Sequence, residues 1–167
     1  MRLTPSRHRE TLGSYHWIFL ALPSPLPETL INANPQFYFT HTINSWTGTR
    51  WKGKLDPIAM ESWVGQYSDE SVVTGALEDY RAGASIDLDD DAEDTASAAG
   101  GALSMELLVL YSAHLGRRFD VEGVWKALAK GPVRIVKVGD EQTGHFIPIE
   151  TEDTLKEMLE WLSRLQN

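Results

Sequence analysis

The chain has 167 residues, 42% of them hydrophobic and 23% charged, which is typical of an ordinary globular domain with a sizeable core. Its formal net charge of −9 disfavours nucleic-acid backbones and anionic lipid surfaces as partners. The absence of cysteine excludes disulfides, thiolate catalysis and cysteine-ligated metals. No apolar run approaches the roughly 20 residues that cross a bilayer, and the first five residues lack the apolar core of a signal peptide. We therefore expect a cytoplasmic protein.

The first half of the chain has the pattern of a helical domain. Apolar residues recur at helical spacing, and prolines stand where helices are expected to begin or end. Asp56-Pro57 and Ser68-Asp69 have the composition of helix starts. The expected elements are helices over residues 7–22, 26–34, 35–46, 58–67 and 68–80, with a loop over 47–54.

Residues 87–94 form an acidic run, Asp-Leu-Asp-Asp-Asp-Ala-Glu-Asp. A calcium loop of the EF-hand type needs glycine at its sixth position and glutamate at its twelfth, where this chain has Ala92 and Ala98. We therefore predict a solvated acidic loop. The five histidines show no zinc-ligand spacing, and no glycine-rich phosphate loop is present, so no metal and no cofactor is predicted.

The pattern changes near residues 95–104. Apolar runs over 105–111 and 133–138 predict buried strands, and helices are expected over 121–129 and 151–165. The order strand, helix, strand, helix predicts a right-handed parallel unit, so the fold class is α/β, with a helical half before an α/β half. Parallel sheets usually have more than two strands and are covered on both faces, which indicates part of a larger fold.

His145 lies in a Gly-His-Phe loop between the second predicted strand and the last helix. The unperturbed pKa of histidine, about 6.5, suits a general base at neutral pH. Taken alone, the tripeptide is equally consistent with a surface histidine that has no chemical role.

Seven stretches together resemble the α/β-hydrolase superfamily, and within it the haloacetate (fluoroacetate) dehalogenases, from about Thr4 onward. They are residues 15–20 (Tyr-His-Trp-Ile-Phe-Leu), 25–28 (Pro-Leu-Pro-Glu), 78–87 (Glu-Asp-Tyr-Arg-Ala-Gly-Ala-Ser-Ile-Asp), 108–110 (Leu-Val-Leu), 119–120 (Phe-Asp), 124–125 (Val-Trp) and 144–146 (Gly-His-Phe). Their order and spacing carry the resemblance. It implies a partial α/β-hydrolase fold, with a helical cap domain over 1–94 and the C-terminal part of the core over 95–167.

The resemblance also implies a mechanism. In this family an aspartate attacks the carbon bearing the halogen, and a histidine activates water to hydrolyse the resulting ester. The base would be His145, and the halide- and substrate-binding donors would be His16, Trp17 and Tyr80. Imidazole N–H, indole N–H and phenol O–H groups can surround a small anion. Without the resemblance, aromatic residues on apolar helix faces are more often core than ligand.

Epoxide hydrolases share the cap and use a cap tyrosine in a Tyr-Arg pair such as Tyr80-Arg81. They usually carry the acid that orients the histidine just after the penultimate strand, where this chain has Ser-Ala-His-Leu-Gly at 112–116. The haloacetate branch places this acid upstream of the cap, which favours the dehalogenase interpretation. Asp120 is a fallback acid, although its position suits the start of a helix.

The chain lacks the part of the family pattern that carries the nucleophile. No aspartate precedes Asp56, and no Gly-x-Ser-x-Gly elbow is present. Whether the chain is itself an enzyme therefore stays open. We expect the C-terminal portion of a hydrolase, from a truncated gene or gene model, inactive alone, whose parent binds a small-molecule haloacid or epoxide.

Two alternatives remain. The chain could derive from an epoxide hydrolase, or it could be a non-catalytic interaction or dimerisation module. Family members commonly pair through their caps, so a homodimer is a candidate assembly. Neither a nucleic acid nor a membrane is an expected partner.

Overall fold

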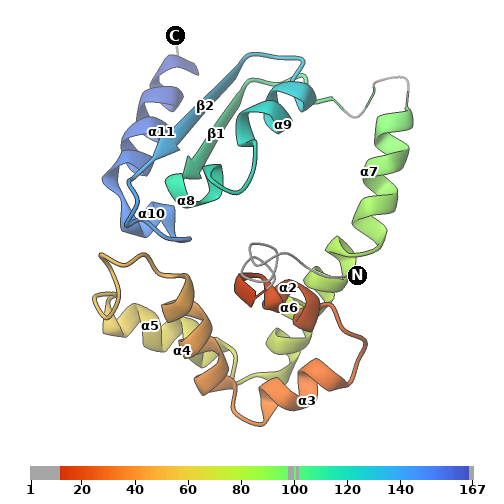
Figure 1. Cartoon of the computed structure of the whole chain (residues 1–167), viewed down its shortest axis with the longest axis vertical. Helices are drawn as coiled ribbons and strands as arrows, with labels where there is room; N and C mark the ends of the chain where they lie inside the picture. Colours follow the sequence, from red (N-terminus) through yellow and green to blue (C-terminus); the bar gives the residue numbers. More distant parts are fainter. Residues whose placement is uncertain (1–11, 98–99, 101, 166–167) are drawn as a thin grey trace. The chain divides into compact units, whose positions relative to one another are not determined.

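The computed structural model describes residues 12–97, 100 and 102–165 (Figure 1). The chain forms two compact units, Met1–Thr40 with Ile58–Ala92, and His41–Pro57 with Glu93–Asn167. The predicted division at residue 94 assigns residues 41–57 to the helical domain, whereas in the structure these residues cluster with the second unit.

Helices form the described part of the first unit. The helices expected over 26–34, 35–46, 58–67 and 68–80 are confirmed within a few residues, and the first residues of the helix expected over 7–22 lie outside the described chain. Asp69 caps α6, because its carboxylate accepts a hydrogen bond from the Ser71 N–H at 2.8 Å. The helices are α2 (Tyr15–Leu20), α3 (Leu26–Asn32), α4 (Pro35–Trp46), α5 (Pro57–Gln66) and α6 (Glu70–Gly83), with α4 and α5 extending across the unit boundary.

The core of the first unit lies where α6 packs against α2 and α3. Its buried residues are Leu20, Ile31, Val73 and Leu77. Burial of each such aliphatic side chain contributes about 1.5–3 kcal/mol. Partly buried aromatic side chains, including Tyr80, pack against these residues. The core therefore fixes α2 and α6, the two helices that carry three of the predicted site residues.

The acidic run is a helix, and the prediction of a loop was wrong. Helix α7 covers Ile86–Ala96, with Asp87 and Asp89 in its first turn. Negative charge is favourable at that end because the helix dipole is positive there. Every described side chain of α7 is exposed, so the acidic groups stay solvated within the helix. Among the described residues, no group of three or more acidic or histidine side chains could hold a metal ion.

The second unit contains the predicted parallel pair of strands. Strands β1 (Leu107–Ser112) and β2 (Val133–Val138) are parallel, in a register that pairs Leu107 with Val133 and Ser112 with Val138. The predicted helices are α9 (Val121–Leu128) and α11 (Glu152–Leu165), which lie on opposite sides of the pair (Figure 1). The strand-helix-strand-helix order and the α/β fold class are confirmed.

Two short helices were not predicted, namely α8 (Ala113–Gly116) and α10 (Ile147–Glu150). Each has four residues, which is too few for a hydrophobic period to be recognised. Both follow the carboxyl end of a strand. They therefore lie at the edge where open α/β sheets place their ligand sites.

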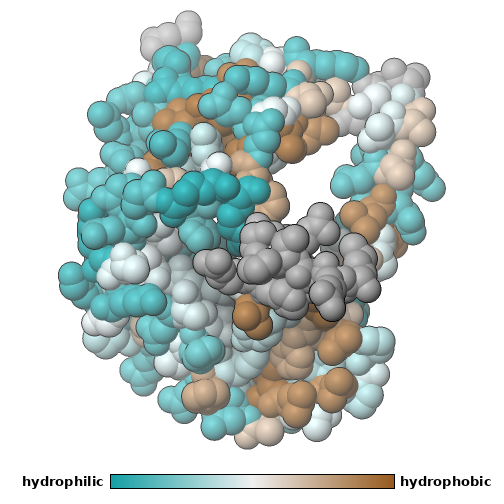
Figure 2. All heavy atoms as spheres, viewed as in Figure 1, coloured by the Kyte–Doolittle hydropathy of each residue, from teal (hydrophilic) through white to brown (hydrophobic). Residues whose placement is uncertain are grey.

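Apolar side chains of the second unit remain exposed on α9 and α11. Figure 2 shows apolar surface over the strands and α9 near the top of the view. On α11 the exposed residues fall on one face, at Leu155, Met158, Leu159, Leu162 and Leu165. Exposed apolar faces of this kind mark surfaces that bind another element or partner. No described helix is long and apolar enough to cross a membrane.

Candidate active-site residues

Three of the predicted site residues lie together in the first unit. The ring centroids of His16 and Trp17, on α2, lie 6.4 Å from the ring centroid of Tyr80, on α6. Both rings meet Tyr80 nearly edge-on, at 87° and 89°, a favourable arrangement for aromatic pairs. The packing of α2 on α6 therefore brings an imidazole, an indole and a phenol into one cluster.

The environment of Tyr80 keeps its phenol protonated. Burial raises the pKa of Tyr80, and the electrostatic effect of Tyr67 raises it further. A raised pKa keeps the O–H as a hydrogen-bond donor at all ordinary pH values. Trp17 is a donor at every pH, and 67% of its surface is exposed. The cluster can thus offer hydrogen bonds to an anion without a change of protonation at these two residues.

Arg81 fixes the helices that carry this cluster. Its Nη2 donates to Glu28 Oε1 at 2.8 Å, and its Nε donates to the Leu22 carbonyl at 3.0 Å. A third bond joins Nη1 to Glu78 Oε1 at 2.6 Å. The guanidinium therefore ties α6 to the start of α3 and to the turn after α2, which holds α2 against α6.

The Glu28–Arg81 pair predicts an acid-sensitive step in the stability of the first unit. Burial would raise the pKa of Glu28, but hydrogen bonds from its own N–H and from Arg81, with the Arg81 charge, together lower it below 4.5. The ionised pair therefore stabilises the fold above pH 4.5, and this contribution is lost as the pH falls through the lower folded-state pKa. We expect Glu28→Gln to cost about 1–3 kcal/mol at pH 7 and less at pH 3.

Urea unfolding of the two proteins at pH 7 and pH 3 measures this difference. Glu78→Gln is the matched control, since the Glu78 side chain is 63% exposed and its pair with Arg81 should contribute about 0.2–1 kcal/mol. An equal cost of Glu28→Gln at both pH values would contradict the prediction.

His145 belongs to the second unit, in the exposed loop after β2. Its backbone N–H donates to the Trp46 carbonyl at 2.9 Å. Its imidazole lies 5.2 Å from the Trp46 ring and 5.3 Å from the Phe146 ring, measured between centroids. Within the described part of the chain, no carboxylate forms a hydrogen bond with the imidazole. The structure thus fixes the backbone of His145 and places its exposed ring beside two aromatic side chains.

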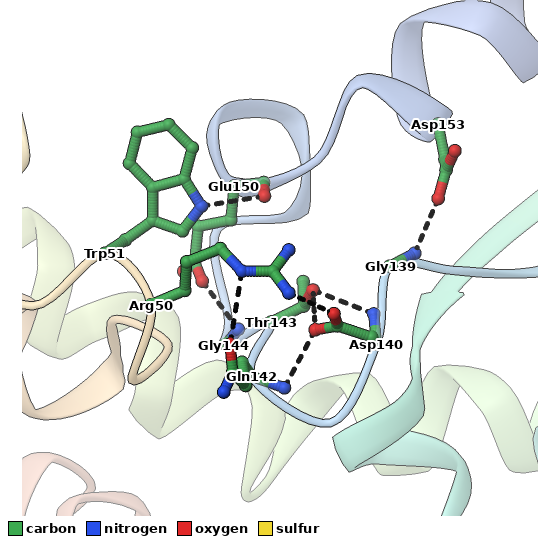
Figure 3. Close-up of polar contacts among 9 residues, drawn as sticks. All are labelled: Arg50, Trp51, Gly139, Asp140, Gln142, Thr143, Gly144, Glu150 and Asp153. Atoms are coloured by element: carbon green, nitrogen blue, oxygen red, sulfur yellow. Dashed lines mark hydrogen bonds and ion pairs between the residues drawn. The ribbon is translucent and has the colours of Figure 1, made fainter.

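Glu150, the last residue of α10, was not among the predicted site residues. Only 2% of its surface is exposed. Its carboxylate accepts hydrogen bonds from three backbone N–H groups, those of Gly48, Gly144 and Phe146, at 2.9, 2.6 and 3.2 Å. Its own carbonyl accepts from Trp51 Nε1 at 2.9 Å (Figure 3). The only sequence signal is a glutamate five residues after His145, and nothing local indicates that it is buried.

The turn that precedes the loop is also held by polar contacts. Asp140 accepts a hydrogen bond from the Gln142 N–H at 2.9 Å and forms an ion pair with Arg50 (Figure 3). The bond from Gln142 lowers the pKa of Asp140; burial opposes this, and Arg50 lowers the pKa further. The Asp140 N–H donates to Thr143 Oγ1 at 3.0 Å. The ion pair with Arg50 and the hydrogen bonds within the turn therefore order residues 139–143.

Asp120, the fallback acid, begins a helix as its position indicated. Its side chain accepts a hydrogen bond from the Gly123 N–H at 3.0 Å and caps α9. The segment after β1 folds as α8 and is capped by Ser112, whose hydroxyl accepts from the Leu115 N–H at 3.2 Å. The carboxylate that epoxide hydrolases usually carry there has no counterpart in residues 112–116.

Comparisons with known proteins give the family. No protein-family model matches the chain. A fluoroacetate dehalogenase from Burkholderia sp is 36% identical over 77 residues, which are 46% of this chain and 25% of that protein. A candidate epoxide hydrolase from Pseudomonas aeruginosa superposes with a TM-score of 0.78 and 30% identity, over 93% of this chain and 50% of that one. A candidate α/β hydrolase from Nostoc sp PCC 7120 superposes with a TM-score of 0.75 and 32% identity, over 90% of this chain and 49% of that one.

The chain belongs to the α/β-hydrolase superfamily. It spans about half the length of the solved structures that it resembles, and its match is to their C-terminal part. The proteins that it resembles include one named as a fluoroacetate dehalogenase and others named as candidate epoxide hydrolases. The family and fold class expected from the sequence are confirmed.

Proposed function

We propose that this chain supplies the second half of a haloacetate dehalogenase. A carboxylate from the remainder of the hydrolase attacks the carbon that bears the halogen, the carbon–halogen bond breaks, and the halide leaves with the bonding electrons. His145 then takes a proton from water as the water attacks the carbonyl carbon of the ester. His16, Trp17 and Tyr80 donate hydrogen bonds to the departing halide. The observation that carries the proposal is the cluster of three donors on α2 and α6.

The second candidate is an epoxide hydrolase. Tyr80 favours it as much as the first, because a phenol with a raised pKa can also donate to an epoxide oxygen. The segment after β1 argues against it, since residues 112–116 hold no carboxylate and Asp120 is occupied as a helix cap. An orienting acid upstream of the cap, as in the dehalogenases, agrees better with these contacts.

The experiment is to join this chain to the N-terminal half of the Burkholderia relative, which supplies the nucleophile. We expect the joined protein to release fluoride from fluoroacetate, because the aspartate and the water-activating histidine are then present together. A fluoride electrode follows the reaction, and Tyr80→Phe should slow it by about 10–100-fold, since one donor to the developing halide is lost.

One control and two alternative results would decide between the candidate functions. The 167-residue chain alone should release no fluoride, and release from it would overturn the assignment of the nucleophile to another segment. Turnover of a small terminal epoxide in place of fluoroacetate would support the second candidate. A joined protein that folds, as shown by gel filtration and thermal unfolding, yet turns over neither substrate would favour a non-catalytic interaction module.

A further inference from the structure

The His145 loop is joined to a distant turn of the chain by an unusually close backbone contact. A methyl group on Gly144 would overlap the Gly48 N–H and the Trp46 carbonyl and would lie 2.8 Å from Gly48 Cα. A methyl group on Gly48 would lie 2.5 Å from Gly144 N. Neither glycine has a positive φ, so backbone conformation does not explain why glycine stands there. The close approach of the two segments is what requires glycine at both positions. The two backbone segments are thus in direct contact just before His145.

Two backbone N–H groups that meet in this way need an acceptor, and the Glu150 carboxylate provides it. Oε2 accepts from both Gly48 and Gly144, and Oε1 accepts from Phe146. The residues before and after His145 are therefore bound to one carboxylate. The His145 N–H itself donates to the Trp46 carbonyl, so three successive backbone groups, at 144–146, are held.

We propose that Glu150 is a positioning residue for His145, whose loop it holds against residues 46–48 through its carboxylate. The inference deepens the proposed function and rests on the role of His145 as base. Helix α4 ends at Trp46, and residues 46–48 belong to the segment 41–57, which in the sequence separates the two parts of the first unit. The segment that links α4 to α5 therefore sets the place of the base.

A carboxylate is required because all three bonding groups are donors. An amide at the same position has one oxygen and one NH2 group. Whichever way the amide is turned, its NH2 group would face a backbone N–H, and a buried donor without an acceptor is costly. Glu150→Gln keeps the size of the side chain, so it replaces at least one of the three hydrogen bonds by a clash of donors and leaves the packing volume nearly unchanged. Glu152→Gln makes the same charge change at an exposed site two residues away.

NMR of the full 167-residue chain tests the proposal without any need for activity. In the wild-type chain, we expect the Gly48 and Gly144 amide protons to exchange with solvent about 100-fold more slowly than amides of exposed turns. In Glu150→Gln the backbone amides that face the NH2 group, either Phe146 or the Gly48 and Gly144 pair, should lose protection by about 10-fold or more. The His145 ring protons should lose the shifts caused by the Trp46 and Phe146 rings. Glu152→Gln should leave both signals as in the wild type.

Two NMR results would overturn the positioning role of Glu150. Unprotected Gly48 and Gly144 amides in the wild-type chain would overturn the proposal even if Glu150→Gln fails to fold. Unchanged His145 shifts in a folded Glu150→Gln chain would also overturn it. In the joined hydrolase, Glu150→Gln should lower kcat by about 100-fold and lower KM with it, so that kcat/KM stays within about twofold, because hydrolysis of the ester is slowed while substrate binding and ester formation are kept. An inactive joined wild type would count against the proposed function and leave the NMR result standing.

Discussion

Replacing His145 with asparagine in the joined hydrolase is expected to stop the reaction after its first step. The attack of the aspartate on fluoroacetate requires no base, so one equivalent of fluoride should still be released per active site. Hydrolysis of the ester does require a base, and loss of a general base slows such a step by about 100- to 10,000-fold. The covalent ester should therefore accumulate.

Rapid-quench measurement of fluoride and mass spectrometry of the intact protein test this expectation together. The burst of fluoride should equal the protein concentration, and the mass should increase by that of the attached carboxymethyl group, because the aspartate becomes the acyl part of the ester. His114→Asn is the control, because His114 is also an exposed histidine and follows the other strand, β1. Steady turnover by His145→Asn within about twofold of the wild type would show that another residue activates water.

The sequence predicted those features that depend on local pattern. The strand at 133–138 was predicted to the residue, and four helices of the first unit were predicted within a few positions, because periodic apolar residues and capping residues such as Asp69 are local signals. The prediction of a loop over the acidic run was wrong because it was based on charge alone. Asp87 and Asp89 instead stabilise the start of α7.

The candidate site was predictable only in part. His16, Trp17 and Tyr80 were singled out by a resemblance in order and spacing, and the packing of α2 on α6 brings their rings within 6.4 Å. The role of Glu150 could not be predicted. It depends on a contact between residues 48 and 144, which are far apart in the sequence and are joined only when the second unit folds.

The close contact of Gly144 with residues 46 and 48 should also affect turnover. We expect Gly144→Ala to slow the hydrolysis step of the joined hydrolase by about 100-fold, because the added methyl overlaps backbone atoms of residues 46 and 48 and displaces the loop by a distance that catalysis does not tolerate. Backbone atoms cannot move aside as the end of a flexible side chain can. Overpacking of this kind should also destabilise the second unit by about 1–3 kcal/mol.

Gly75→Ala separates this effect from a general effect of a glycine substitution. Gly75 lies within α6, and a methyl group there would have no atom within 4 Å. Alanine is the better helix former, so this variant should gain about 1 kcal/mol in unfolding free energy and keep the wild-type rate of fluoride release. If Gly144→Ala hydrolysed the ester as fast as Gly75→Ala, the loop could shift without moving His145. The close contact between residues 48 and 144 would then have no part in catalysis, whereas a slow Gly144→Ala protein that still forms the ester would assign the contact to the second chemical step.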